Sequence, residues 1–417
     1  MRHPALRRPA WIGLLCLGCG NVLGLDELEY RDLPNTTPSG GVCDPGSLAI
    51  SALNPERVKG DPMPAPPVGD IVADVAFGTP RVRLTDENDG VDCVPAGPEP
   101  ISPRARHVAY ACDVGSRFEL RVLDLGGNFA PGDRRVIPDL PAGAAPEAEV
   151  LWDGEDAIFV HDARRLTRYD LATQKHESVA DFSASLSGAE LESMTADATR
   201  QLFGFIARLG NSRTYFTWQR ASEERVPFTQ DDATHVELDG TGQWLVVHAQ
   251  ASKLRLHALA VPSSAPTELG PAQFVPDESL GVVSGGAFVN GLTNGSPTPG
   301  TPTVLSRALT APDQTTSLID FEPGSDGLVH LGAATDLPGW VAVSRLNASP
   351  SALSAEIFLL SDDHRMRRLA RHGWGASPIR PTPYLSRNAC ALVFPTNWGG
   401  ALANAGNHVF LLDLRAP

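Results

Sequence analysis

The sequence contains little lysine, and its charge balance is strongly negative. Lysine occurs only at Lys59, Lys175 and Lys253, so almost all positive charge is arginine. The formal net charge is −15, and residues 1–18 hold three arginines and no acid, which leaves −18 on the remainder. A surface of this charge repels phosphate backbones and anionic headgroups. The composition therefore predicts no nucleic-acid partner.

The common catalytic and cofactor motifs are also missing. The chain has no Walker loop, no HExxH, no Rossmann fingerprint and no Gly-x-Ser-x-Gly elbow. Val282–Gly286 and Thr37–Gly41 come nearest to the elbow, and both lack its first glycine. Prolyl-peptidase chemistry is therefore not expected, and the sequence predicts no cofactor.

The first residues have the parts of an export signal. A basic segment and an apolar run over residues 10–17, too short to span a bilayer permanently, precede Gly18 and Cys19. Cys16-Leu17-Gly18-Cys19 resembles a bacterial lipobox, although Cys16 stands where leucine is usual. The resemblance implies that Cys19 is acylated and becomes the new N-terminus. A plain secretory signal and a zinc or redox Cys-x-x-Cys pair are the less favoured alternatives, the latter because no histidine except His3 lies close.

These features predict where the protein resides and how it is divided. Several acyl chains anchor a protein without a transmembrane helix, and Gly20 in place of aspartate favours the outer membrane. Residues 19–70 are rich in Pro, Gly, Asp and Ser, which cannot bury enough apolar surface to offset chain entropy. We expect a signal peptide over 1–18, a flexible tether over 19–70 and a folded domain over 71–417, in a lipid-anchored protein of the bacterial cell envelope.

The folded region repeats one apolar segment seven times. The copies alternate apolar and polar residues and precede short turns, as β-strands do. Their starts lie 39 to 54 residues apart, close to the roughly 40 to 50 residues of a four-stranded propeller blade. The copies are ELRVLDL from 119, RLTRYDL from 165, YFTWQRA from 215, LRLHALA from 254, TVLSRAL from 303, IFLLSDD from 357 and VFLLDLR from 409.

Two further series accompany these copies. One precedes each copy across a turn and starts at 107, 157, 202, 244, 286, 340 and 391; a more polar one follows and starts at 134, 176, 224, 266, 316 and 366. They predict the second and the outer strand of each blade, with charge that discourages edge aggregation. The missing seventh outer strand is RVRLTDE from Arg81. The count predicts an all-β, seven-bladed β-propeller closed by this N-terminal strand.

A family resemblance supports the same fold. RVRLTD, ISPRARHVAY with ELRVLDL, and YLSRNACALVFPTNWGG with HVFLLDL are similar to the TolB-type, WD-repeat-like propeller pattern, over roughly 74–417. In that pattern a Ser-Pro-Asp-Gly turn links strands one and two. The turns at 102–105 and 386–389 lack the Asp-Gly here. The pattern specifies a fold and no chemistry.

Four cysteines remain beyond the signal, an even number in an oxidising compartment: Cys43, Cys93, Cys112 and Cys390. Three pairings are possible. In the strand order above, Cys93 enters blade one and Cys112 ends its second strand, so both fall on one propeller face. We expect a Cys93–Cys112 disulfide, and a Cys43–Cys390 disulfide because the N-terminus lies beside the last blade.

Polar residues lie in or next to matching positions at the ends of second strands: Asp113, His161, His248 and Asn397. They could form a ligand face, with metal binding as in propeller polysaccharide lyases that hold a metal with histidines. We favour hydrogen bonds to loops, because blades two and four are not adjacent. Neither a metal site nor a catalytic set is predicted.

Two other segments look functional but favour structural interpretations. Asp86–Asp92 resembles a calcium loop, but its glycine is one place too early and no glutamate closes it, so we expect an acidic hairpin turn. Trp398 is expected to pack within its blade rather than stack on a sugar.

Two functions remain. The favoured one is a non-catalytic binding or scaffold lipoprotein that holds an envelope protein, peptide or glycan. The alternative is a polysaccharide-active enzyme, a lyase or hydrolase, with a site assembled from several blades. Histidines or carboxylates that converge at the channel mouth would favour the enzyme.

Overall fold

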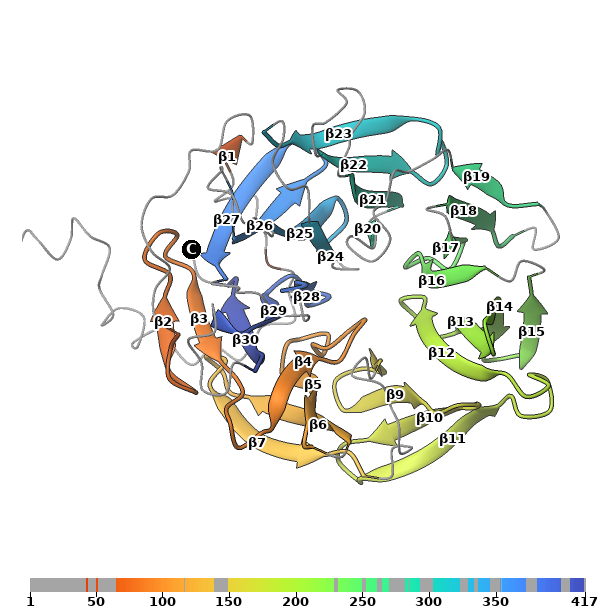
Figure 1. The fold of residues 1–417 in the computed structure, drawn as a ribbon, viewed down its shortest axis with the longest axis horizontal. Helices are drawn as coiled ribbons and strands as arrows, with labels where there is room; N and C mark the ends of the chain where they lie inside the picture. The colour runs from red at the N-terminus through yellow and green to blue at the C-terminus, as the bar shows by residue number, and fades with distance from the viewer. Residues whose placement is uncertain are drawn as a thin grey trace, which may run out of the picture.

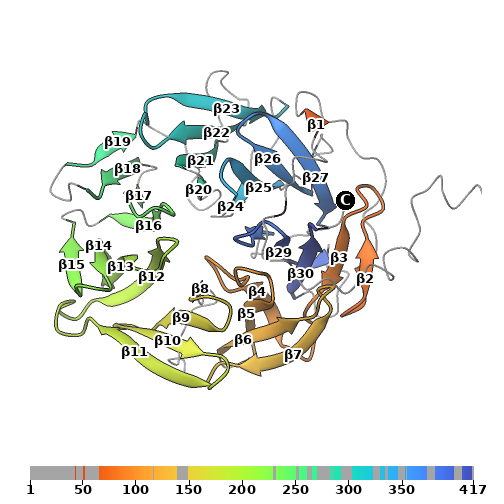
Figure 2. The ribbon, with the colours of Figure 1, turned by 180° about the vertical axis from the view of Figure 1, so that it is seen from behind.

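The computed structural model describes most of the repeat region and a few points of the segment before it. The described residues are 43, 50–51, 65–115, 117–138, 149–228, 232–249, 253–260, 265–269, 282–284, 286–292, 303–322, 329–333, 337–345, 353, 355–372, 381–398 and 406–415. The elements in these ranges are β-strands, and they form seven sheets arranged around a ring (Figure 1). Figure 2 shows the same order of sheets from behind.

The first four sheets follow the chain from the inside of the ring outward. Sheet 1 contains β4 (Val91–Pro95), β5 (His107–Asp113), β6 (Phe118–Leu125) and β7 (Pro131–Val136). Sheet 2 contains β8 (Leu151–Trp152), β9 (Ala157–His161), β10 (Arg165–Asp170) and β11 (Lys175–Asp181). Sheet 3 contains β12 (Glu190–Ala196), β13 (Leu202–Leu209), β14 (Ser212–Gln219) and β15 (Glu224–Pro227). Sheet 4 contains β16 (Ala233–Leu238), β17 (Trp244–Ala249), β18 (Lys253–Ala258) and β19 (Thr267–Leu269).

The last three sheets include strands from the N-terminal segment. Sheet 5 contains β20 (Val282–Ser284), β21 (Ala287–Leu292), β22 (Thr303–Ala308) and β23 (Thr315–Asp320). Sheet 6 contains β24 (Val329–Ala333), β25 (Trp340–Arg345), β26 (Glu356–Ser361), β27 (Arg365–Arg371) and β1 (Ile50–Ser51). Sheet 7 contains β28 (Tyr384–Leu385), β29 (Ala391–Thr396), β30 (His408–Asp413), β3 (Pro80–Arg83) and β2 (Ile71–Ala73).

The three repeated series coincide with strands two, three and four of these sheets. Antiparallel pairing joins each second-strand segment to its third, as between β5 and β6 or β29 and β30. Apolar residues from the faces of successive sheets pack together: Val122 of sheet 1 lies in one cluster with Trp152 and Ile158 of sheet 2. These faces bury the apolar side of each strand, which is the main stabilising term of such a fold.

The ring closes through the N-terminal strand. β3 pairs with β30, with Arg81 opposite Leu412 and Val82 opposite Leu411. The prediction that the segment from Arg81 pairs with the last repeat is therefore confirmed. β2 adds a further strand outside β3, which the repeat count did not predict.

Parts of the predicted tether lie on the ring. Cys43 is bonded to Cys390, and its N–H donates to the Asn388 carbonyl at 2.9 Å. β1 pairs antiparallel with β27, the outer strand of sheet 6. Composition missed these contacts because a single disulfide and a two-residue strand leave no periodic signal. The signal peptide, Cys19 and the rest of 1–64 lie outside the described residues.

Three turns between first and second strands share one backbone geometry. Ser386 Oγ accepts the N–H of Ala391, and Asp239 Oδ1 accepts the N–H of Trp244, each five residues on. The fourth turn residue takes a left-handed backbone: φ is 54° at Ala105, 56° at Ala389 and 70° at Gly242. A glycine has no steric penalty at such a φ, whereas alanine does.

Candidate functional site

The inner strands are held to one another by side chains that cross between sheets. Glu149, before β8, accepts hydrogen bonds from Ser193 Oγ at 2.9 Å and from the Met194 N–H, both of β12. Thr195 Oγ1 accepts the N–H of Leu238 at 3.2 Å in the next sheet. An inner strand is a sheet edge whose N–H groups need partners. These bonds supply acceptors for two of them.

Four titratable side chains lie close together just before β8 and on β9, β16 and β17, in sheets 2 and 4. His161, at the end of β9, places Nε2 3.8 Å from Glu149 Oε2. His235 of β16 lies close enough to Glu149 for the carboxylate to raise its pKa, against a larger effect of burial that lowers it. The His235 and His248 rings are 5.4 Å apart between centroids in edge-to-face contact. We call Glu149, His161, His235 and His248 the central cluster.

The cluster contains two neutral imidazoles at neutral pH. Burial lowers the pKa of His235. Burial and the neighbouring His235 lower the pKa of His248 well below its ordinary value. Neutral imidazoles can donate and accept hydrogen bonds but carry no charge. His161 and His235 are the histidines of the cluster that lie near the Glu149 carboxylate.

The structure therefore connects two predicted residues that the sequence kept apart. Sheets 2 and 4 are not adjacent, but Glu149 and His235 bridge the distance between His161 and His248. Sequence reasoning missed both bridging residues because Glu149 lies just before β8 and His235 lies in β16, and the three repeated series include neither position. The objection that the two histidines belong to separate blades no longer holds.

Asp113 and Asn397 lie in sheets 1 and 7 and are not members of the cluster. Asp113 Oδ1 accepts the N–H of Gly115 at 2.7 Å, which fixes the turn after β5. Asn397 is buried directly after β29. Trp398 is also buried, stacks on Phe410 and lies under the Arg81 guanidinium, as expected for a packing residue.

The cluster does not have the form of a metal centre. Within the described ranges, no group of three or more His, Cys, Asp or Glu residues is placed to hold a metal ion. Glu149 instead accepts a hydrogen bond from the Met194 N–H, and the His235 ring packs against the His248 ring. We therefore assign no metal ion to the central cluster.

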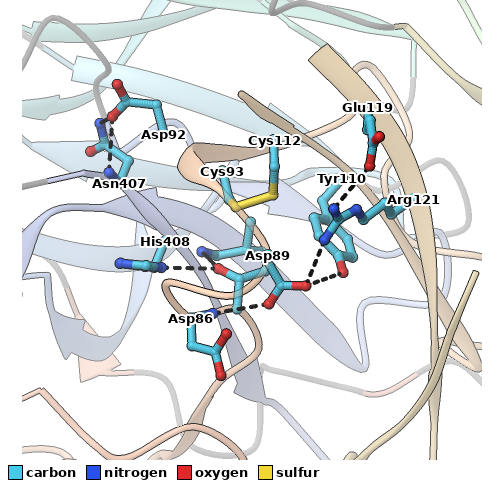
Figure 3. The surroundings of a disulfide bond; sticks show 12 residues. Asp86, Asp89, Asp92, Cys93, Tyr110, Cys112, Glu119, Arg121, Asn407 and His408 are labelled. Atoms are coloured by element: carbon cyan, nitrogen blue, oxygen red, sulfur yellow. Dashed lines mark hydrogen bonds and ion pairs between the residues drawn. A yellow bond between two sulfur atoms is a disulfide. The ribbon is translucent and has the colours of Figure 1, made fainter. Parts of the chain in front are cut away.

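Sheet 1 carries the second concentration of polar residues, around a disulfide (Figure 3). Cys93 of β4 and Cys112 of β5 are bonded, as predicted, 19 residues apart. Beside them, buried Asp89 accepts hydrogen bonds from Tyr110 Oη at 3.1 Å and Arg121 Nη1 at 3.0 Å. Arg121 pairs with Asp89 at 3.0 Å and with Glu119 at 2.9 Å, which is typical of a structural ion-pair network.

The prediction of an acidic hairpin turn over 86–92 is wrong. β3 pairs with β30 and β4 pairs with β5, so the segment connects two sheets instead of two paired strands. Asp86 and Asp89 bond within the segment, and Asp92 Oδ1 accepts from Asn407 Nδ2 at 2.9 Å (Figure 3). The repeat count already placed the segment from Arg81 in the last blade, so the connection from that segment to blade one had to cross between sheets; only the acidic composition of 86–92 suggested a hairpin.

Comparisons with known proteins identify the fold. No protein-family model matches the chain, and no curated protein matches it. Solved structures do: an oligogalacturonate lyase in complex with manganese shares 14% identity at a TM-score of 0.60, covering 87% of this chain and 98% of that one. The oligogalacturonate lyase of Vibrio parahaemolyticus shares 11% at 0.59, covering 82% and 96%.

A third structure is a TolB protein. TolB of Acinetobacter baumannii shares 10% identity at a TM-score of 0.40, over 74% of this chain and 79% of that one, which supports no further argument. Together with the ring of sheets, the first two similarities show that the chain has an all-β propeller fold, as predicted. At these identities they show the fold alone.

Proposed function

We propose that the protein is a polysaccharide-active propeller enzyme whose site is the central cluster. The observation that carries this proposal is the convergence of Glu149 and three histidines from sheets 2 and 4. Acid–base catalysis needs a base near the substrate and a group that orients it. The glycan substrate class comes from the lyases that share the fold.

Each member of the cluster has a proposed role. His161 takes a proton, and the Glu149 carboxylate stabilises the imidazolium that forms. The hydrogen bonds from Ser193 and Met194 hold Glu149 in place for this task. The neutral His235 and His248 bind sugar hydroxyls without attracting an ion.

The experiment is turnover by the purified protein on separate sets of neutral and uronate oligosaccharides. Two sets are needed because a net charge of −15 disfavours anionic polymers. Ultraviolet absorbance of an unsaturated product reports a lyase, and new reducing ends without it report a hydrolase. Glu149→Gln and His161→Ala are expected to lower kcat about 10²–10⁴-fold.

His176→Ala is the matched control. His176 is exposed on the outer strand β11 of the same sheet, where Nε2 contacts the Pro138 carbonyl at 3.0 Å. Its replacement should leave kcat unchanged. Turnover that survives both cluster variants would contradict the proposal. Oligosaccharide binding without turnover would contradict it too, and would support the second candidate, a non-catalytic binding module.

We further propose that the seven sheets are the blades of a closed propeller tethered in the bacterial envelope by acylated Cys19. The lipobox-like residues support the anchor, and the β3–β30 pairing supports the closure. Mass spectrometry of the N-terminal peptide from membrane fractions tests the anchor. A peptide that begins at Cys19 with no added acyl mass would contradict it.

A further inference from the structure

We propose that Glu237 is the proton donor of the central cluster, the group that protonates the leaving glycosidic oxygen. This inference rests on the proposed function and adds a residue that the cluster does not contain. It starts from the position of Glu237 on β16, two residues after His235. Alternate residues of a strand point to the same side, so Glu237 and His235 share one side of β16, about 7 Å apart along the strand.

One oxygen of the Glu237 carboxyl is fixed by the next sheet. Oε1 accepts the N–H of Val283, the second residue of β20, at 2.8 Å. This is the same kind of inter-sheet bond that Glu149 and Thr195 make on the preceding sheets. The bond orients the carboxyl group and leaves Oε2 available to carry the proton.

The other oxygen has no hydrogen-bond partner within the described part of the chain. Oε2 is shielded from solvent, although part of the side chain reaches it. A buried carboxyl oxygen without a partner costs free energy, since water is no longer available to it. A proton on Oε2 removes the charge, and the resulting O–H can donate a hydrogen bond to a ligand oxygen.

The surroundings keep that proton in place at neutral pH. Burial raises the pKa of Glu237 to about 8, and the Val283 N–H only partly opposes it. Val246 lies opposite on β17 and Val283 on β20, and neither is charged. His235 is the titratable group on its own strand, and its lowered pKa keeps it neutral. Glu237 is therefore a neutral acid on the same side of β16 as His235, the protonation state that a general acid needs.

The reaction balances with these groups. In hydrolysis, a water gives a proton to His161 while its oxygen bonds to the anomeric carbon. The carbon–oxygen bond to the leaving sugar breaks, and its oxygen takes the proton of Glu237. The proton on His161 then returns to Glu237 through solvent. In elimination, His161 takes the proton of a ring carbon, and the electrons of that C–H bond form a carbon–carbon double bond. The bond from the neighbouring carbon to the glycosidic oxygen breaks, and that oxygen takes the proton of Glu237.

The test is Glu237→Gln, measured with two kinds of substrate. Glutamine keeps an oxygen for the Val283 N–H but cannot give up a proton. For natural oligosaccharides, whose leaving group must be protonated, we expect kcat to fall about 10²–10⁴-fold. For aryl glycosides, whose leaving group departs as an anion, kcat should fall less than about tenfold. Equal losses for both substrates would overturn the proposal.

The pH profile gives an independent readout. In the wild-type protein kcat should fall as pH rises through about 8, because the donor must be protonated. This fall in kcat at high pH should vanish in Glu237→Gln and remain in Thr195→Val. The Thr195→Val control removes an inter-sheet hydrogen-bond acceptor but no titratable group. If the fall remains in Glu237→Gln, Glu237 is not the donor, while wild-type turnover still supports the proposed function.

Discussion

On the side of the ring where the chain closes, buried Asp89 lies between Tyr110, Arg121 and a disulfide, and buried Arg81 is 3.4 Å from Asp74. In sheets 2 and 4, the central cluster and Glu237 together supply two carboxyls and three histidines, and no arginine is bonded to Glu149 or Glu237 in the described ranges (Figure 1). The buried polar groups of the two regions are therefore compensated in different ways.

This difference separates structural polarity from candidate chemistry. A buried carboxylate that is paired with arginine stays ionised and fixes the local structure. A buried group that is left to backbone donors and imidazoles has a shifted pKa and can exchange protons near neutral pH. Burial raises the pKa of Glu237 and lowers the pKa of His248. The following predictions test the comparison.

The largest expected effect is the loss of Asp89. Asp89→Ala leaves Arg121 partly buried and removes the acceptor of the Tyr110 hydroxyl. We expect the free energy of unfolding to fall by about 3–5 kcal/mol, as for one partner of a buried ion pair. Urea unfolding measures it, with Glu237→Gln at pH 7 as the matched change across the ring. A similar loss in both variants would break the comparison.

The second prediction concerns the disulfide that ties the N-terminal segment to sheet 7. Cys43 and Cys390 are 347 residues apart, so their bond restricts the unfolded chain strongly. Replacing both with serine should lower the free energy of unfolding by about 2–4 kcal/mol. Thermal unfolding with and without reductant checks this. If reduction lowers the Tm of wild type and the double variant equally, Cys43–Cys390 contributes nothing.

The third prediction is the pH dependence of stability on the cluster side. The folded pKa of Glu237 is about 8, above the ordinary value of a carboxyl in the unfolded chain, about 4.3. The stabilisation that Glu237 contributes to folding is therefore fully present below pH 4 and is lost as pH rises toward 8. Wild type should lose stability relative to Glu237→Gln between pH 5 and pH 8, in urea unfolding. A constant difference across that range would show that Glu237 has an ordinary pKa.

The smallest predicted effect concerns the turns. Ala105 and Ala389 adopt φ of 54° and 56°, where an L side chain is strained. Glycine relieves this strain but costs entropy in the folded state, so Ala389→Gly should stabilise by about 0.5–1 kcal/mol. Gly242→Ala, at φ 70°, should do the opposite. Tm measurements decide, and destabilisation by Ala389→Gly would contradict the turn geometry.

Much of the ring could be read from local patterns. β6, β10 and β30 match their repeats because alternating or short continuous apolar runs predict strands. β1 and β2 are too short to show such a pattern. Of the cluster, His161 and His248 were found because they share a repeat position, whereas Glu149, just before β8, and His235, on β16, lie outside the repeated series.

The sequence by itself determined the second, third and outer strands and the strand that closes the ring, because periodicity and the order of strands along the chain are local or countable properties. The tertiary structure decided among the possible cysteine pairings, and it alone decided which polar groups meet. Glu149, His161, His235, Glu237 and His248 come from sheets 2 and 4, and the pKa values of His235, Glu237 and His248 depend on burial and on neighbours that no spacing in the sequence encodes.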